Sequence, residues 1–203
     1  AAAWLERSVS ALAKAREQGP SAIERLPVKP PAVPPSSPDR REEIRQALRS
    51  GQIQPWFQPQ ISTHTGEISG FEALARWVHP TKGIILPSDF LPLVDQADLF
   101  EQLAETMMRG GFAALKAWDN AGFDVPAIAV NFSGPELSNP ALIEKIKWEL
   151  DHFDLNPDRL VIEILETVVS NVDDDIITKN IHQLEQLGCR IDLDDFGTGQ
   201  ASI

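Results

Sequence analysis

Short apolar runs alternate with amphipathic helical stretches over most of the chain. Runs of β-branched and other apolar residues bounded by turn residues predict strands over residues 54–62, 68–78, 127–132, 160–165 and 189–193. Apolar residues at three- and four-residue spacing predict helices over residues 41–49, 91–120, 139–153 and 173–187. Because strands and helices alternate, the pattern predicts a largely parallel sheet with crossover helices.

Glycines mark turns and breaks in this pattern. Gly66 lies between the first two predicted strands, which favours a hairpin. Gly51 and Gly188 are expected to end the helices that precede them. The pair Gly110-Gly111 predicts a break inside the long helical stretch.

The first 39 residues differ from the rest. Residues 1–18 are rich in alanine and have a helical apolar spacing, which predicts the helical tail of an upstream region. Residues 19–39 are rich in proline and predict an extended, stiff linker. The sequence therefore places the main domain at residues 40–203.

Composition narrows the class of protein. Hydrophobic residues make up 42% of the 203 positions, so the chain can build a sizeable core. The net charge of −12 argues against binding of long nucleic acid, which requires a basic surface. The single cysteine, the absence of an apolar run of about 20 residues and the absence of a signal-type start predict a cytoplasmic segment without membrane contact, or the cytoplasmic part of a larger membrane-attached protein.

Polar residues recur at the ends of the predicted strands. Asn131, Glu163 and Asp194 recur about every 30 residues, which is about the length of one βα unit in a (β/α)₈ barrel. Asp195 follows Asp194, and Glu72 lies in the second predicted strand. Barrel enzymes place their active sites at the carboxyl ends of the strands, so these side chains are expected to converge there.

Carboxylates gathered without cations would repel each other. A set of oxygen ligands suits Mg²⁺ or Mn²⁺ better than zinc, and two such ions can clamp a phosphodiester. Each residue also has a simpler interpretation. Glu163 alone is most often part of a salt bridge, Asp194-Asp195 alone most often forms a turn, and Asn131 alone most often bonds a strand end.

Six ordered blocks over about 150 residues give a more specific signal. They are FQPQI (57–61), GFEALARW (70–77), HPTKGIILPSDFLPLVDQADL (79–99), VNFSGPELS (130–138), IEILE (162–166) and DLDDFGTGQAS (192–202). Together they resemble the EAL family of cyclic di-GMP phosphodiesterases.

The resemblance implies a fold, an activity and a set of site residues. It implies an α/β fold, a (β/α)₈ TIM-like barrel whose first strand is antiparallel, and hydrolysis of cyclic di-GMP to the linear dinucleotide pGpG with two Mg²⁺ or Mn²⁺ ions. By matching motifs, the implied metal ligands are Glu72, Asn131, Glu163, Asp194 and Asp195. The implied catalytic residues are Glu72, Glu163, Asp194, Asp195 and Glu166, of which Glu166 anchors the loop after DDFGTG. The implied substrate contacts are Gln58, Leu74 and Arg76.

This sequence departs from the family pattern at two places. Leu165 stands where the family has threonine, which removes a hydroxyl near the site. The chain ends at Ile203, after about five of the eight expected strands and before the family's Lys-Ile-Asp block, later Glu and later Gln. We therefore expect a domain that is truncated at its carboxyl end and inactive in this chain alone, although active in the complete protein.

An alternative function follows from the same departures. The domain is then a catalytically weak or inactive sensor of cyclic di-GMP, or a protein-interaction module. The resemblance also implies a homodimer and an upstream sensor or regulatory domain as candidate partners.

Overall fold

The computed structural model describes residues 38–165, 168 and 175–194. The helix predicted over residues 1–18 and nearly all of the linker predicted over 19–39 lie outside these residues and stay predictions. The first described helix, α2 (Pro38–Arg49), begins two residues inside the predicted linker. Proline is compatible with this position because the first turn of a helix does not need its N–H group.

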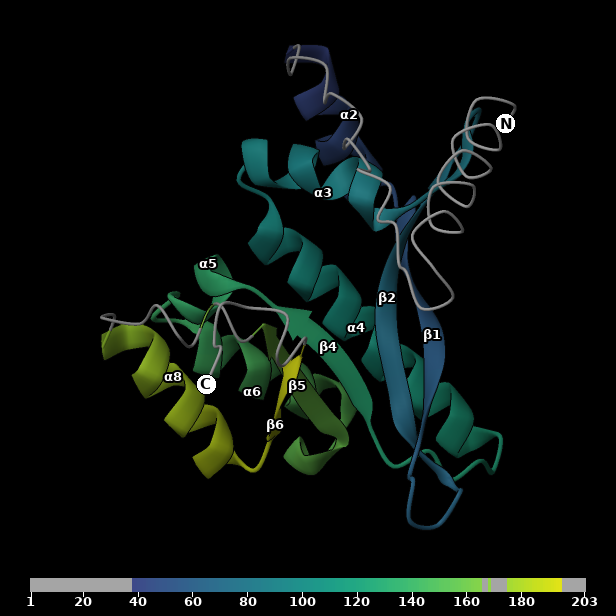
Figure 1. Ribbon diagram of the computed structural model, residues 1–203, viewed down its shortest axis with the longest axis vertical. Helices are drawn as coiled ribbons and strands as arrows, with labels where there is room; N and C mark the ends of the chain where they lie inside the picture. The colour runs from purple at the N-terminus through teal and green to yellow at the C-terminus, as the bar shows by residue number, and fades with distance from the viewer. Residues whose placement is uncertain (1–37, 166–167, 169–174, 195–203) are drawn as a thin grey trace, which may run out of the picture. The chain divides into compact units, whose positions relative to one another are not determined.

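The sheet has the predicted arrangement. In spatial order its strands are β1 (Ile53–Ile61), β2 (Ile68–His79), β4 (Ile128–Phe132), β5 (Leu160–Leu165) and β6 (Arg190–Asp194). The strands β1 and β2 form an antiparallel hairpin, whereas β2, β4, β5 and β6 are parallel. Figure 1 shows the long β1–β2 hairpin at one side of the sheet and β6 at the other. The described part is thus an open portion of a (β/α)₈-like barrel with its first strand antiparallel, as predicted.

The structure contains a short strand that was not predicted from the sequence. Residues Gly83–Ile85 form β3, which pairs with the end of β2. Gly83 has a φ of 76°, so it takes the left-handed conformation that the tight turn between the strands requires. Three residues are too few to show a strand period, which is why the sequence gives no signal for this strand.

The long helical stretch breaks at another place than the glycine pair. The helix α3 (Pro87–Gln96) ends before Asp98, whose φ is 55°, and α4 (Phe100–Asn120) then runs through Gly110 and Gly111 without interruption. The predicted break at the glycine pair is therefore wrong. A Cβ atom on Gly110 would lie 2.5 Å from Cγ of Pro55 in β1, so the glycine allows close packing of α4 on the sheet.

The helices cover one face of the sheet. After β4 come α5 (Gly134–Leu137) and α6 (Leu142–Phe153), and α8 (Asp175–Leu187) precedes β6. Every second residue of β4 and β5 is apolar and buried in the core that these helices share with α4. The largest fully buried side chains of this core include Phe90, Phe112, Leu115, Ile128, Ile146, Leu160, Ile162, Ile164 and Leu184.

Two polar contacts fix the loops around β4 and β5. The buried Asn180 of α8 donates through Nδ2 to the carbonyl oxygens of Leu137 and Asn139, at 2.7 and 2.9 Å. Arg159, which precedes β5, donates to both carboxylate oxygens of Asp119, at 2.9 and 3.3 Å. The first contact holds the segment after β4, and the second holds the end of α4 against the start of β5.

Candidate active site

The sheet face away from the helices carries the predicted polar residues. Asn131 of β4 lies beside Glu163 of β5, which lies beside Asp192 of β6. Two residues further along β6, Asp194 lies beside Leu165. Because side chains alternate between the faces of a strand, these residues share one face, with a small apolar floor of Ala127, Ala129 and Val161 below them. We call the face that carries Gln60, Glu72, Asn131, Glu163, Asp192 and Asp194 the carboxylate face.

Two amides hold two of the carboxylates. Asn131 Nδ2 donates a hydrogen bond of 2.9 Å to Oε1 of Glu72. Gln60 Nε2 donates a hydrogen bond of 2.8 Å to Oε1 of Glu163. The two bonds connect β4 to β2 and the hairpin strand β1 to β5, so the carboxylate face is ordered by side chains from four strands.

Glu163 is the most perturbed group of this face. Its residue is 7% exposed, and burial is the main cause that raises the pKa of its carboxyl to about 7. The carboxylates of Glu72, Asp194 and Asp192 raise this pKa further, while the hydrogen bond from Gln60 lowers it. A strongly shifted pKa among like charges is typical of functional sites.

One carboxylate oxygen of Glu163 has no hydrogen-bond partner in the part of the chain that the structure describes. Its Oε2 atom is buried and accepts no hydrogen bond from the described residues. A buried carboxylate oxygen without a donor is costly unless it is protonated or bound by a cation. The unsatisfied oxygen and the oxygen-only side chains around it fit a hard divalent cation.

The described side chains do not by themselves complete a metal site. Within residues 38–165, 168 and 175–194, no group of three or more His, Cys, Asp and Glu side chains is arranged so that it could hold a metal ion. The predicted ligand Asn131 would contribute an amide oxygen, which is outside this set of side-chain types. The predicted ligand Asp195 and the predicted catalytic residue Glu166 lie outside the described residues.

The three predicted substrate contacts lie on the hairpin. Gln58 pairs with Glu72 across β1 and β2, and its side chain is exposed. Leu74 and Arg76 follow Glu72 at two-residue steps, so they share its face of β2. Arg76 Nη1 donates a hydrogen bond of 2.8 Å to the carbonyl oxygen of Ala75. Within the described residues its guanidinium makes no ion pair. The arrangement leaves Arg76 available for an anionic ligand.

Two residues of the carboxylate face were missed from the sequence. Gln60 lies two residues after Gln58, and Asp192 lies two residues before Asp194. The period of two in a strand could have indicated both, because each shares a face with a residue that was predicted. Their contacts with Glu163 depend on pairing between distant strands and need the structure.

Comparison with known proteins decides the family. A family model described as the EAL domain matches residues 41–203. The chain belongs to the EAL domain family. This membership confirms the resemblance found in the six sequence blocks.

Relatives of this EAL domain are signalling proteins. The chain is 38% identical over 161 residues to an uncharacterized signaling protein of Caulobacter vibrioides, which covers 79% of this chain and 19% of that protein. It is 33% identical over 162 residues to the bifunctional diguanylate cyclase/cyclic di-GMP phosphodiesterase MucR of Pseudomonas aeruginosa. This alignment covers 79% of this chain and 23% of MucR. The chain thus spans about a fifth of the length of these curated relatives.

Solved structures share the fold of this EAL domain. The PaMucR phosphodiesterase in complex with c-di-GMP matches with a TM-score of 0.74 at 32% identity, over 81% of this chain and 66% of that one. The FimX EAL domain of Xanthomonas citri matches with a TM-score of 0.70 at 19% identity, over 79% of this chain and 62% of that one. The second match shows the fold alone. In the described part of this EAL domain, no helix is both long enough and apolar enough to cross a bilayer.

Proposed function

We propose that this EAL domain, in the complete protein, binds cyclic di-GMP and hydrolyses it to the linear dinucleotide pGpG with the help of two Mg²⁺ or Mn²⁺ ions. The observation that carries the proposal is the buried Oε2 atom of Glu163, which has no hydrogen-bond partner among the described residues and lies among the carboxylates of Glu72, Asp192 and Asp194. Membership of the EAL family and the likeness to a c-di-GMP complex of a phosphodiesterase support the substrate.

The proposed ligands come from neighbouring strands. Glu72, Asn131, Glu163, Asp194 and Asp195 would hold the cations, because their oxygens face one another or follow the same strand end. Bound divalent cations supply charge neutralisation for a phosphodiester and lower the pKa of water, which makes a nucleophile near neutral pH.

The remaining residues bind and orient. Gln60 holds Oε1 of Glu163 through its 2.8 Å hydrogen bond, which restricts rotation of the carboxylate. Arg76 would donate to a phosphate oxygen, for which its planar guanidinium is suited. Gln58 and Leu74 would contact the rest of the nucleotide from the same hairpin. Glu166 would anchor the loop after DDFGTG.

Hydrolysis balances without an added redox partner. The oxygen of water forms a bond to one phosphorus of the cyclic dinucleotide, and the bond from that phosphorus to the 3′ oxygen of ribose breaks. One proton of the water leaves to solvent or a carboxylate, and the released 3′ oxygen takes up a proton. The product is the linear dinucleotide with a 5′ phosphate.

Leu165 favours one alternative. Its side chain is 39% exposed beside Asp194, so an apolar group faces the carboxylates where a hydroxyl would donate a hydrogen bond. A domain weakened in this way would bind cyclic di-GMP without efficient turnover and act as a sensor or as a protein-interaction module.

One experiment separates these functions. The complete protein is incubated with cyclic di-GMP and Mg²⁺ or Mn²⁺, pGpG is followed by chromatography, and binding is measured by calorimetry in parallel. Glu72→Ala is compared with Glu67→Ala, which removes an exposed carboxylate from the same hairpin. Product that Glu72→Ala abolishes and Glu67→Ala preserves supports hydrolysis. Binding without product supports the sensor, and absence of both overturns the proposal.

A further inference from the structure

A cavity of about 350 Å³ lies between α4 and α6. This volume falls in the range of small-molecule sites in proteins. Phe132 of β4 forms part of its wall, and the preceding residue, Asn131, lies on the carboxylate face. Since neighbouring residues of a strand point to opposite faces, the cavity lies behind the sheet and is separate from the proposed active site.

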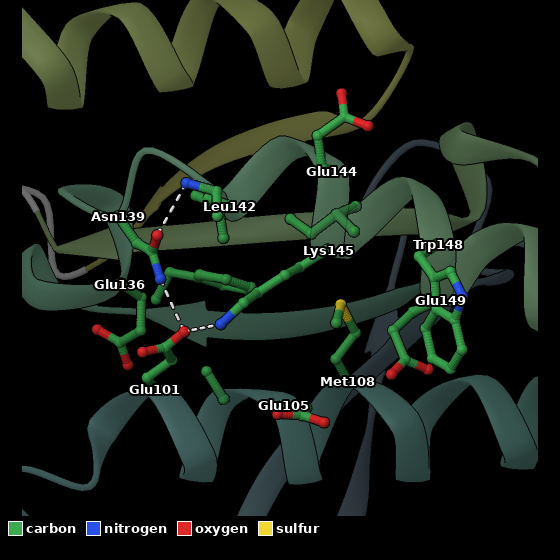
Figure 2. Close-up of a pocket in the computed structure, with 14 residues that line it drawn as sticks. Glu101, Glu105, Met108, Glu136, Asn139, Leu142, Glu144, Lys145, Trp148 and Glu149 are labelled. Atoms are coloured by element: carbon green, nitrogen blue, oxygen red, sulfur yellow. Dashed lines mark hydrogen bonds and ion pairs between the residues drawn. The ribbon is translucent and has the colours of Figure 1, made fainter.

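The cavity has an apolar wall and an acidic rim. Its apolar lining consists of Ala104, Met108, Phe132, Ala141, Leu142, Ile146 and Trp148. Its carboxylates are Glu101, Glu105, Glu136, Glu144 and Glu149. Figure 2 shows Glu101, Glu105 and Met108 of α4 and Lys145 and Glu149 of α6 around the space between the two helices, whereas Glu144 points away from it. Acidic residues on a surface are common, so their number alone does not define a ligand.

Most of the acidic groups are already engaged. Lys145 pairs with Glu101, which also accepts a hydrogen bond of 2.7 Å from Asn139 Nδ2. Glu136 accepts hydrogen bonds from the backbone N–H and the hydroxyl of Ser133. These contacts stabilise the walls of the cavity, and the ammonium of Lys145 pairs with Glu101 rather than with Glu149.

Glu149 differs in that one of its carboxylate oxygens has no hydrogen-bond partner among the described residues. The residue is 3% exposed, and its Oε2 atom is buried without a hydrogen-bond partner among the described residues. Arg109 lies 3.6 Å from its other oxygen, measured from Nε to Oε1, which is too long for a hydrogen bond. Figure 2 shows the Glu149 carboxylate pointing from α6 toward α4, beside Met108. Burial also raises the pKa of this carboxyl.

An aromatic ring lies next to this carboxylate. Trp148 lines the cavity and is 58% exposed, so its ring can be reached from solvent. Its ring stacks on His152 with an interplanar angle of 6°. Indole rings attract organic cations, and the attraction adds to that of a nearby carboxylate.

We propose that the α4–α6 cavity binds a small organic cation that carries an ammonium or guanidinium group on an aliphatic body. The cationic group donates to Glu149 Oε2 and packs at Trp148, and the aliphatic body contacts Met108, Phe132 and Ile146. A bare metal ion fits poorly, because one free carboxylate oxygen in an apolar cavity cannot replace its hydration shell. An anion is excluded by the surrounding carboxylates.

The chain contains a spectroscopic probe for this site. Its only two methionines are the neighbours Met107 and Met108, of which Met108 lines the cavity and Met107 is buried outside it. The full chain is labelled with ¹³C-methyl methionine and titrated with n-hexylammonium chloride at constant ionic strength, and Met108→Leu assigns the two signals. Saturable movement of the Met108 signal, with a much smaller movement of the Met107 signal, is expected.

Matched ligands and variants test the chemistry. 1-Hexanol, which has the same aliphatic body without the charge, is expected to bind at least about tenfold more weakly. Glu149→Gln keeps the shape of the side chain and is expected to weaken hexylammonium by about tenfold or more. Asp151→Asn, on the same helix but outside the cavity, should leave affinity unchanged. Arg109→Gln should strengthen binding, because it removes the cation nearest to Glu149.

Three results would overturn the proposal. They are an unmoved Met108 signal at millimolar amine, equal affinity for amine and alcohol, and unchanged affinity in Glu149→Gln. Two-dimensional spectra of each variant check that it is folded. None of these readouts depends on turnover of cyclic di-GMP, so the proposal can fail or stand apart from the proposed function.

Discussion

Gln60 Nε2 lies 2.8 Å from Glu163 Oε1, although the two residues are 103 positions apart in the chain. Gln60 belongs to the antiparallel hairpin strand, and Glu163 belongs to a parallel strand of the sheet. The bond engages one oxygen of Glu163 and leaves the other, Oε2, buried on the carboxylate face. Gln60 is therefore a positioning residue for the proposed metal ligand.

Replacing Gln60 by Ala should weaken the proposed cation site. Without the amide, Glu163 can rotate, and its pKa rises further because the hydrogen bond that lowers it is lost. Removal of such an orienting partner commonly costs about 10- to 100-fold in metal affinity or activity. In the complete protein, the Mn²⁺ concentration for half-maximal hydrolysis should rise, with a smaller change in kcat at saturating Mn²⁺.

Gln54→Ala is the matched control for this variant. Gln54 lies on the same strand and has an exposed side chain, and it lies away from Glu163 in the pairing of the strands. An equal rise in the Mn²⁺ requirement for both variants, or no rise in Gln60→Ala, would contradict the positioning role.

Glu163 should make the stability of the cation-free domain depend on pH. Its folded-state pKa of about 7 lies above the ordinary value of 4.5, so the folded state holds its proton more tightly than the unfolded state. The contribution of Glu163 to the free energy of unfolding is fully present below about pH 4.5 and is lost as the pH rises through about 7. A shift of this size corresponds to about 3 kcal/mol.

Glu163→Gln should remove this penalty. In urea unfolding with a chelator, the variant is expected to gain up to about 3 kcal/mol over the parent chain at pH 8 and little at pH 4.5. The exposed Glu67→Gln should show no such difference. A variant that is destabilised equally at both pH values would show that Glu163 contributes mainly through its packing.

The main architecture could be predicted from the sequence because it rests on local patterns. Asn131 and Glu163 each end or nearly end a buried apolar run, and strands joined by a crossover helix are parallel and usually adjacent in the sheet. The register then brings the two residues side by side. The hairpin followed from two alternating segments joined by Gly66, whose φ is 74°.

The features that the sequence did not predict depend on contacts between distant residues. The glycine pair predicted a break because intrinsic propensity disfavours glycine in helices, but tight packing against Pro55 and Ile128 requires the absence of a side chain. Similarly, the packing of α6 against α4 leaves one oxygen of Glu149 buried without a hydrogen-bond partner among residues 38–165, 168 and 175–194. Sequence spacing identifies a buried helix face, but it does not show which polar atoms on that face lack partners.

Cys189 should be unreactive in the folded chain. It is buried, and burial raises the pKa of its thiol to about 11 from 9.0, which reduces the thiolate population at pH 8 by about a hundredfold. Reaction with Ellman's reagent at pH 8 should be slow in buffer and fast in urea. Since this is the only cysteine, the signal is unambiguous. Labelling at the rate of a free thiol while circular dichroism shows folded protein would contradict the burial.

Gly110→Ala should destabilise the domain although alanine is the better helix former. Propensity alone would add up to about 1 kcal/mol of stability. The new Cβ would lie 2.5 Å from Cγ and 2.8 Å from Cδ of Pro55, whose ring is rigid, so α4 would have to move away from β1. The expected net loss in the free energy of unfolding is about 1–3 kcal/mol, as measured by urea denaturation.

Two further variants isolate the steric cause. Gly134→Ala, where the structure leaves open space around the added methyl group, should change stability little. Pro55→Ala should relieve the clash, because the Cβ atom that remains lies 3.8 Å from the new methyl group, an ordinary contact distance. In a double-mutant cycle the two substitutions should therefore couple favourably. If Gly110→Ala instead stabilises the domain, or if the two effects simply add, then α4 and β1 are not held together by the close approach of Gly110 and Pro55.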